Sequence, residues 1–227
     1  MELPSQIPVM TLPSATLFPQ ALLPLYIFEP RYRKMLADAL QSHRMFSVAM
    51  QDPTRVREKP CTIAGLGLIR VSVDHADGTS HLILQGLTRV ELVETVQTKP
   101  YRVETIRPLE TALVDSVVID ALVAKVLELV NLRMRIAPPP FPFPSLQPTA
   151  AGKKKAKTKA SAVAAKDIVQ YLEKLPSADQ MADLVSCAVL TSPVARQTIL
   201  ATLPLEERLK HLIHFLMADI EQHEKGG

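Results

Sequence analysis

The spacing of hydrophobic residues changes partway along this chain, and that change constrains its fold more than any other feature. From Ile63 to about Leu109, apolar residues roughly alternate with polar ones, which is the two-residue period of a half-buried β-strand. In the second half they recur at spacings of three and four, the period of an amphipathic helix. Strands followed by helices predict an α+β protein.

The strand-like region is expected to form an antiparallel meander that curls into a small barrel or sandwich. Asp77-Gly78 is a strong hairpin signal between two strand-like runs. Nearer the start, the apolar runs Val9–Leu12 and Leu22–Phe28 are punctuated by prolines, so strands there should be short, bent or at a sheet edge. A helix from Pro30 to about His43 and then a buried strand over Met45–Met50 are expected to follow these runs.

The remaining chain reads as helices with recognisable N-terminal caps. Asp115 or Ser116 is expected to cap a helix that runs through Arg135. Further helices are predicted to begin after Ser177, after Ser192 and at Leu205. The chain is thereby divided into a β-rich subdomain at residues 1–110 and a helical subdomain at residues 111–225.

Residues 137–165 interrupt the helical subdomain with a Pro-rich and then a Lys-rich stretch, which we interpret as a disordered insertion. Phe141 and Phe143 lie between prolines, and an extended segment of this kind is either a docking peptide for a partner or is held on the protein's own surface. The five lysines within Lys153–Lys159 dominate the charge: removing them takes the formal net charge from +3 to −2. The basic isoelectric point therefore says little about a nucleic-acid face.

Motifs for catalysis or cofactor binding are not found. The nearest match to a phosphate-binding loop, Ala151–Lys154, lacks the first Gly and the Ser or Thr that the motif needs. The nucleophile motif Gly-x-Ser-x-Gly is absent. Gly65-Leu66-Gly67 lies inside a strand pattern, where it predicts a bulge or close packing. We therefore expect no enzyme, no catalytic residue and no cofactor.

Metal ligands and paired acids are equally poorly supported. Cys61 and Cys187 are far apart and form no Cys-x-x-Cys motif, so both are expected to pack as small hydrophobic residues. Two histidine pairs have no third ligand at a familiar spacing and are interpreted as residues flanking a helix stripe and an exposed hairpin: His211 with His214, and His75 with His81. Three strand carboxylates are expected on a solvated face: Glu91, Glu94 and Glu104.

The start of the chain, Met1–Pro4, has no basic region followed by an apolar core, and no unbroken apolar stretch is long enough to span a membrane. We therefore expect a soluble cytoplasmic protein.

Several segments resemble the Lon protease amino-terminal domain. Ile7–Leu12, Leu17–Pro19 and Leu23–Tyr32 resemble its start, and Gln85–Val90 resembles its later Gly-x-x-Arg strand. Met181–Val185 and Leu200–Leu209 resemble its helical end, and the matches follow the family's order. One departure is that Gln20 stands where the family usually has Gly, which predicts a different turn there.

The resemblance implies a PUA-like β-barrel part followed by a helical bundle. It also implies recognition of unfolded or damaged protein segments, and contact between copies. Neither the ATPase module nor the Ser–Lys protease module is matched, so the resemblance implies a stand-alone, non-catalytic member. Arg31, Tyr32 and Arg89 match family motif positions, and we expect structural roles for them.

The expected function is therefore binding of protein or peptide, in protein quality control or as an adaptor, with no membrane partner. Such a protein could add an extended peptide to a sheet edge or hold it in a groove at the junction of the barrel and the helices. The alternative is an RNA- or other nucleic-acid-associated PUA-like protein, for which binding should depend on salt and on Lys153–Lys159.

Overall fold

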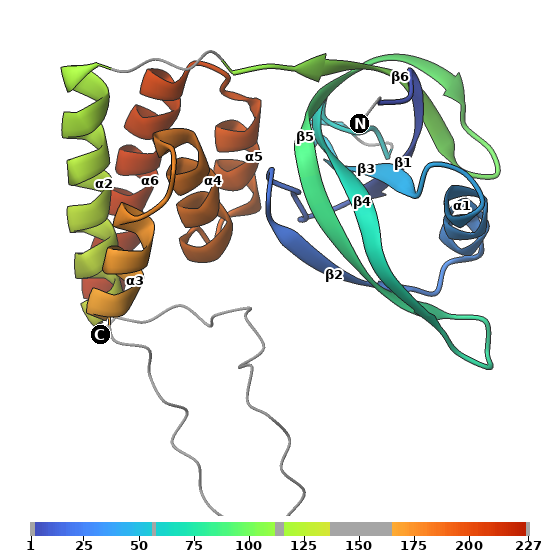
Figure 1. The fold of residues 1–227 in the computed structure, drawn as a ribbon, viewed down its shortest axis with the longest axis horizontal. Coiled ribbons are helices and arrows are strands. Elements are labelled where there is room, and N and C mark those ends of the chain that lie inside the picture. Colours follow the sequence, from blue (N-terminus) through green and yellow to red (C-terminus); the bar gives the residue numbers. More distant parts are fainter. Residues whose placement is uncertain (1–2, 56–57, 112–115, 137–164, 226–227) are drawn as a thin grey trace, which may run out of the picture.

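The structure, a computed structural model, describes residues 3–55, 58–111, 116–136 and 165–225. A β-rich part and a helical part lie side by side, joined where β6 leads into α2 (Figure 1). The strands are β1 (Gln6–Leu12), β2 (Leu22–Ile27), β3 (Met45–Met50), β4 (Ile63–Asp74), β5 (Ser80–Gln97) and β6 (Arg102–Leu109). The helices are α1 (Pro30–Leu40), α2 (Val117–Ile136), α3 (Ala165–Glu173), α4 (Ala178–Val189), α5 (Pro193–Ala201) and α6 (Leu205–Lys225). The predicted α+β class is confirmed.

The strand pairings run in a closed ring, because β5 pairs with both β4 and β6 while the order β4-β3-β1-β6 completes the circuit. β2 lies outside this ring and pairs only with β5, which makes it an edge strand. The expectation of an antiparallel sheet is wrong for one pair, since β1 and β3 are parallel. Between β1 and β3 the chain forms β2 and α1. This crossover connection lets β3 run in the same direction as β1.

The edge strand β2 shows how a proline is accommodated without breaking the sheet. The Gly86 N–H donates to the Ala21 carbonyl at 2.8 Å, so the odd-numbered residues of β2 face the β5 ladder. Pro24 is even-numbered, and its ring nitrogen therefore faces the free edge. Leu22, Pro24 and Tyr26 alternate with inward-facing residues and are exposed on one face of the sheet. The prolines predicted strands that are short, bent or at a sheet edge; β2 is an edge strand, whereas β1, which contains Pro8, pairs on both sides.

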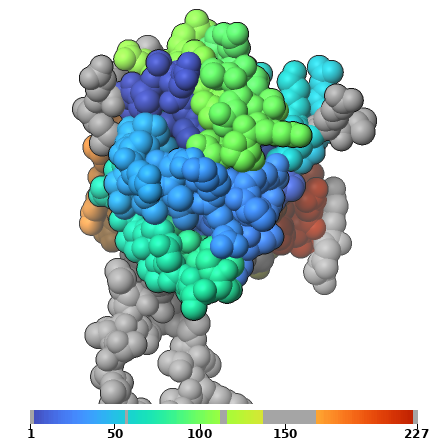
Figure 2. Space-filling model, turned by 90° about the vertical axis from the view of Figure 1, so that its right-hand side faces the viewer, coloured from blue at the N-terminus to red at the C-terminus, as the bar shows by residue number. Residues whose placement is uncertain are grey.

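Helix α1 covers the end of the β-rich part that is remote from the other helices. Figure 2 faces this end, where the blue surface around α1 lies across the strands. Tyr32, Met35 and Leu36 form its buried stripe. The Tyr32 hydroxyl donates to the Thr11 carbonyl at 3.0 Å and accepts from the Thr11 N–H at 3.2 Å, so α1 is fixed to β1.

The predicted caps begin the helices of the second part. The hydroxyls of Ser116, Ser177 and Ser192 each accept a hydrogen bond from the backbone N–H three residues on. The apolar stripe of α6 is buried as its spacing predicts: Leu205, Leu209, Leu212, Leu216 and Ile220. Among the described residues, no helix combines the length and apolarity needed to cross a membrane.

One hydrophobic cluster, formed mainly by the helices, joins the two parts, while two further clusters lie within the β-rich part. Phe18, from the segment between β1 and β2, is fully buried among the helical side chains. A Cβ at Gly65 would lie 1.9 Å from the Leu17 carbonyl oxygen, and one at Gly86 would lie 2.0 Å from that of Phe18. Glycine is therefore required where this segment crosses β4 and β5. The close packing predicted from Gly65-Leu66-Gly67 is confirmed, with a register shift between Leu66 and Gly67.

The predicted insertion falls almost wholly outside the described residues. Phe141, Phe143 and the lysines of 153–159 lie in the range 137–164, of which the structure describes nothing. Ala165, which was expected to belong to the insertion, already begins α3.

Candidate functional site

A groove lies at the junction of the two parts, as the sequence led us to expect. Its first half is a cavity of about 430 Å³ between β2 on one side and α3 and α4 on the other. Leu22 and Tyr171 line it and are 56% and 59% exposed. The lining is otherwise mostly apolar, with Pro24, Ile83, Leu184 and Ala188. We call this the apolar half of the groove.

The second half of the groove is a cavity of about 610 Å³ between α2, the end of α3 and the start of α4. Its lining contains four carboxylates and no Lys, Arg or His: Asp120, Glu173, Asp179 and Asp183. We call it the acidic half. The two cavities adjoin, since both are lined by Pro19, Gln20, Leu175, Gln180 and Asp183, which we call the waist.

The turn at Gln20 brings the sheet side of the waist into position. Gln20 has a φ of 66°, in the left-handed region that favours glycine. Its backbone N–H donates to the Gly86 carbonyl at 2.9 Å, which holds the turn against β5. The side chain is exposed and reaches both halves of the groove. The departure from the family's Gly therefore leaves the glycine-type conformation in place.

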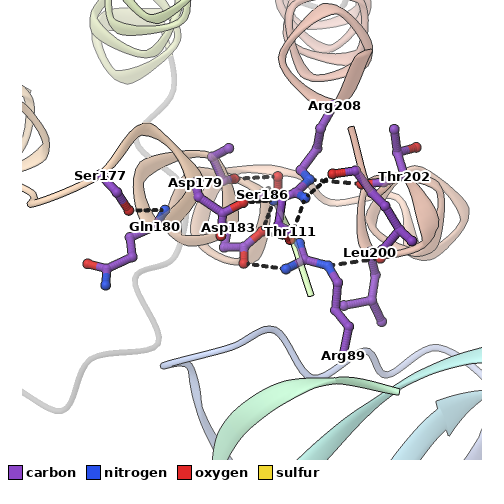
Figure 3. A network of polar contacts seen from close by, with 12 residues as sticks. Arg89, Thr111, Ser177, Asp179, Gln180, Asp183, Ser186, Leu200, Thr202 and Arg208 are labelled. Atoms are coloured by element: carbon purple, nitrogen blue, oxygen red, sulfur yellow. Dashed lines mark hydrogen bonds and ion pairs between the residues drawn. The ribbon is translucent and has the colours of Figure 1, made fainter. Parts of the chain in front are cut away.

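A buried ion-pair network lies beneath the groove and joins the sheet to the helices (Figure 3). Arg89 of β5 and Asp183 of α4 are each 2% exposed. Arg89 donates through both terminal nitrogens to the Asp183 carboxylate, with Nη1 to Oδ2 at 2.9 Å, and through Nε to the Leu200 carbonyl at 3.0 Å. One side chain of the sheet is thereby bonded to both α4 and the end of α5.

Arg208 of α6 completes this network from the helical side. Its guanidinium binds Asp179, lies 3.5 Å from an Asp183 oxygen, and donates to the Thr202 and Leu203 carbonyls. Burial raises the pKa of Asp183, and the two arginines oppose that rise. Because two guanidinium groups face two carboxylates, Asp179 and Asp183 are neutralised within the protein.

The family-motif residues have the structural roles expected of them. Arg89 bonds a helix-terminal carbonyl and a buried carboxylate, and Tyr32 holds α1 on β1. Arg31 donates to Glu29 and Glu58 at 2.9 and 2.8 Å. None of the three lines either half of the groove.

The histidines and cysteines considered as ligands lie in separate places. His75 and His81 are exposed on the β4–β5 hairpin, with ring nitrogens 2.7 Å apart. His211 lies 3.2 Å from the Thr202 hydroxyl. No group of three or more potential metal ligands occurs in the described part of the chain. Cys187 packs against the helical hydrophobic cluster as predicted, and its partly exposed side lines the apolar half; burial raises the pKa of its thiol.

One strand carboxylate contradicts the prediction of a solvated face. Glu104 is 4% exposed. Its carboxylate accepts from Thr95 Oγ1 at 2.8 Å and from Arg102 Nη1 at 2.7 Å. These two donors on and beside β6 compensate for the lost water, so alternation of polar residues did not place this side chain outward. Glu94 is exposed as expected, and Glu91 pairs with Arg107.

A β-barrel-like sheet and a helical bundle that meet through one hydrophobic cluster and leave an open groove between them define a two-part α+β fold. The family described as the ATP-dependent protease La (LON) substrate-binding domain matches residues 6–218. The chain belongs to this family, and the resemblance noted in the sequence is confirmed.

Individual relatives and solved structures agree with this family assignment. The chain is 23% identical over 225 residues to Lon protease of Dictyoglomus thermophilum, covering 97% of this chain and 25% of the relative. The N-terminal domain of Mycobacterium avium complex Lon protease superposes with a TM-score of 0.67 at 16% identity, over 93% of this chain and 98% of that one. A Lon N-terminal domain protein from Xanthomonas campestris gives 0.61 at 18% identity, over 92% and 98%. The chain thus spans about a quarter of the curated relative's length.

The residues that line the groove were not predicted individually. The unbroken apolar run of Leu22–Ile27, in a strand whose proline favours a sheet edge, was a usable signal for Leu22, since an edge strand with an apolar outer face is unusual. Tyr171 and Gln180 gave no such signal, because they meet β2 only through the tertiary packing of α3 and α4.

Proposed function

We propose that this chain binds unfolded or damaged polypeptide segments in the groove and does not cleave them. The observation that carries the proposal is the apolar half of the groove, where Leu22 and Tyr171 remain exposed beside a cavity large enough for side chains of a bound segment. Membership of the LON substrate-binding domain family supports the same role.

The size of the apolar half sets the expected strength of binding. Burying one large apolar side chain contributes about 1.5–3 kcal/mol, and two or three such anchors give about 3–9 kcal/mol before ordering costs. A micromolar complex needs about 8 kcal/mol. We therefore expect micromolar or weaker binding, which suits a site that must accept many sequences and release them.

The free edge of β2 offers a second source of affinity. Carbonyl groups of Leu22, Pro24 and Tyr26 face outward, so an extended segment can add as a strand. Pro24 removes one donor from that edge, which weakens continuous pairing and disfavours aggregation through β2. Main-chain bonds of this kind hold a segment without reading its sequence.

In the cell, we propose a role in protein quality control, as an adaptor or as a competitor for substrates of a protease. The matched relatives are Lon proteases of which this chain corresponds to about a quarter. Cytoplasmic action, self-association and the subdomain division at residue 110 belong to the same proposal. The nucleic-acid alternative has no supporting observation among the described residues, and the lysines on which it depends lie outside them.

The test is binding of a permanently unfolded polypeptide, such as reduced and carboxymethylated lactalbumin, measured by fluorescence anisotropy. Leu22→Ser combined with Tyr171→Ala should weaken binding at least tenfold, since the groove loses two apolar surfaces on which side chains of the segment pack. The matched control is Val93→Ser with Val96→Ser, which removes apolar side chains that are 59% and 49% exposed outside the groove. Equal weakening by both double variants, or no binding by the parent protein, contradicts the proposal.

We further propose that Phe141 and Phe143 dock on a partner protein. Replacing both with Ser should reduce recovery of that partner in a pull-down while leaving binding of the unfolded polypeptide unchanged. Unchanged recovery of every captured protein would exclude this role.

A further inference from the structure

The two halves of the groove differ in charge, and this difference defines a class of substrate. Resting on the function proposed above, we propose that the groove selects segments in which an apolar run is bordered by lysine or arginine. The apolar run occupies the apolar half, and the basic side chain enters the acidic half.

The acidic half carries uncompensated negative charge. Of its four carboxylates, Asp179 and Asp183 are paired with Arg208 and Arg89. Asp120 and Glu173 are exposed, and their carboxylates have no hydrogen bond or ion pair within the part of the chain that the structure describes. They approach the cavity from α2 and from the end of α3. A cationic side chain entering between them meets two negative charges and no positive lining residue.

The apolar half has the opposite character. Its only ionisable carboxylate is Asp183, which is buried and bound by Arg89. A charged residue placed there would lose water without gaining a partner. The groove therefore rejects charge at one end and attracts positive charge at the other.

The waist joins the halves with two amide side chains. Gln20 comes from the sheet side and Gln180 from α4, and both line both cavities. Neither side-chain amide has a hydrogen-bond partner in the described residues, and Figure 3 shows Gln180 pointing away from the ion pairs. An amide can donate to a carbonyl and accept from an N–H, which are the two groups that any peptide backbone offers. The waist is thus suited to hold main chain between an apolar and a basic residue.

The experiment uses synthetic fluorescent peptides of about 14 residues that share one apolar run. Four versions carry two lysines after the run, two lysines before it, two glutamines, or two glutamates. We expect the better lysine peptide to bind the full chain about threefold to tenfold more tightly than the glutamine peptide, and the glutamate peptide to bind more weakly still. The lysine preference should shrink as salt is raised from about 50 to about 300 mM.

Variants of the acidic half test whether its carboxylates cause the preference for lysine. Asp120→Asn with Glu173→Gln should abolish the advantage of lysine while leaving binding of the glutamine peptide within about twofold. The control, Glu94→Gln with Glu224→Gln, removes two exposed carboxylates outside the groove and should leave the advantage intact. Far-UV circular dichroism confirms that each variant is folded.

The outcomes distinguish failure of the charge selection from failure of the proposed function. Equal binding of the lysine and glutamine peptides overturns the charge selection and leaves the proposed function standing. If none of the peptides binds, both the charge selection and the proposed function are wrong. If the lysine preference appears only after the lysines of 153–159 are replaced with Ser, the chain's own basic run fills the acidic half, and the proposed occupant is wrong.

Discussion

Replacing Arg89 with Met should destabilise the protein strongly, because it removes one partner of a buried ion pair. The substitution keeps an unbranched side chain of similar length but removes the guanidinium. Asp183 then loses its bidentate partner, and the Leu200 carbonyl loses a donor. Because Asp183 is 2% exposed, water cannot replace what is lost.

The magnitude follows from the burial of the pair. Removing one partner of a buried ion pair costs about 3–5 kcal/mol, which is a large share of the roughly 5–15 kcal/mol that stabilises a typical domain. For a protein of this size, each kcal/mol lowers Tm by about 2–4 °C, so Arg89→Met should lower it by about 6–20 °C. Arg208 still faces Asp183 at 3.5 Å, which favours the lower part of this range.

The assay is urea unfolding followed by circular dichroism at 222 nm, because the chain contains no Trp for fluorescence. Asp183→Leu and the double variant Arg89→Met with Asp183→Leu complete a double-mutant cycle. The double variant should be more stable than the sum of the single losses predicts, with a coupling of about 2–3 kcal/mol. The exposed pair Arg107–Glu91 serves as the control, where Arg107→Met should cost less than about 1 kcal/mol. A loss below 1 kcal/mol for Arg89→Met, or no coupling in the cycle, refutes the reasoning.

Three further changes test the turn at Gln20, the close contact at Gly86 and the buried hydroxyl of Tyr32. Gln20→Gly should raise the free energy of unfolding by about 0.5–1 kcal/mol in urea titrations, because it relieves a φ of 66°; a loss of stability would contradict this. Gly86→Ala should lower it by about 3 kcal/mol, since the new Cβ would lie 2.0 Å from the Phe18 carbonyl oxygen; a neutral effect would show that the segment moves freely. Burial raises the pKa of Tyr32 to about 12 from an ordinary value of 10.0. The folded state therefore favours the protonated phenol, and stability present below pH 10 is lost as pH rises towards 12. Thermal melts should show a shallower alkaline loss in Tyr32→Phe, and an identical slope would be the contrary result.

Local patterns were sufficient to predict most of the fold. The serine caps, the stripe of α6 and the buried strand β3 depend on residues close in sequence, and each appears as expected. The parallel pairing of β1 with β3 could not be read this way, because a long crossover sets it and leaves no local signal. The prediction that Glu104 is exposed was wrong for a related reason. Alternation describes which way a residue faces, whereas the burial of Glu104 depends on the positions of Thr95 and Arg102 beside it.

The groove was predictable as a place but not as a set of residues. A junction between a sheet and a helical bundle leaves a concave surface on any chain of this class. Its chemistry comes from residues far apart in sequence, such as Leu22, Asp120 and Glu173, which meet only after α2, α3 and α4 pack. Acidic residues on exposed helix faces are common, so Asp120 and Glu173 carried no signal until the structure placed them around one cavity.

The ion-pair network and the groove are one construction, because Asp183 belongs to both. Its carboxylate forms the ion pair with Arg89 that joins the sheet to the helices, and the same residue lines the waist. One wall of the apolar half is built on β2 and the facing wall on α3 and α4, so the width of the groove is fixed by whatever holds β5 against α4. Arg89 does this without touching the cavity. A variant that stays folded but lacks this bond should therefore bind unfolded segments less tightly, even though every side chain that contacts them is unchanged.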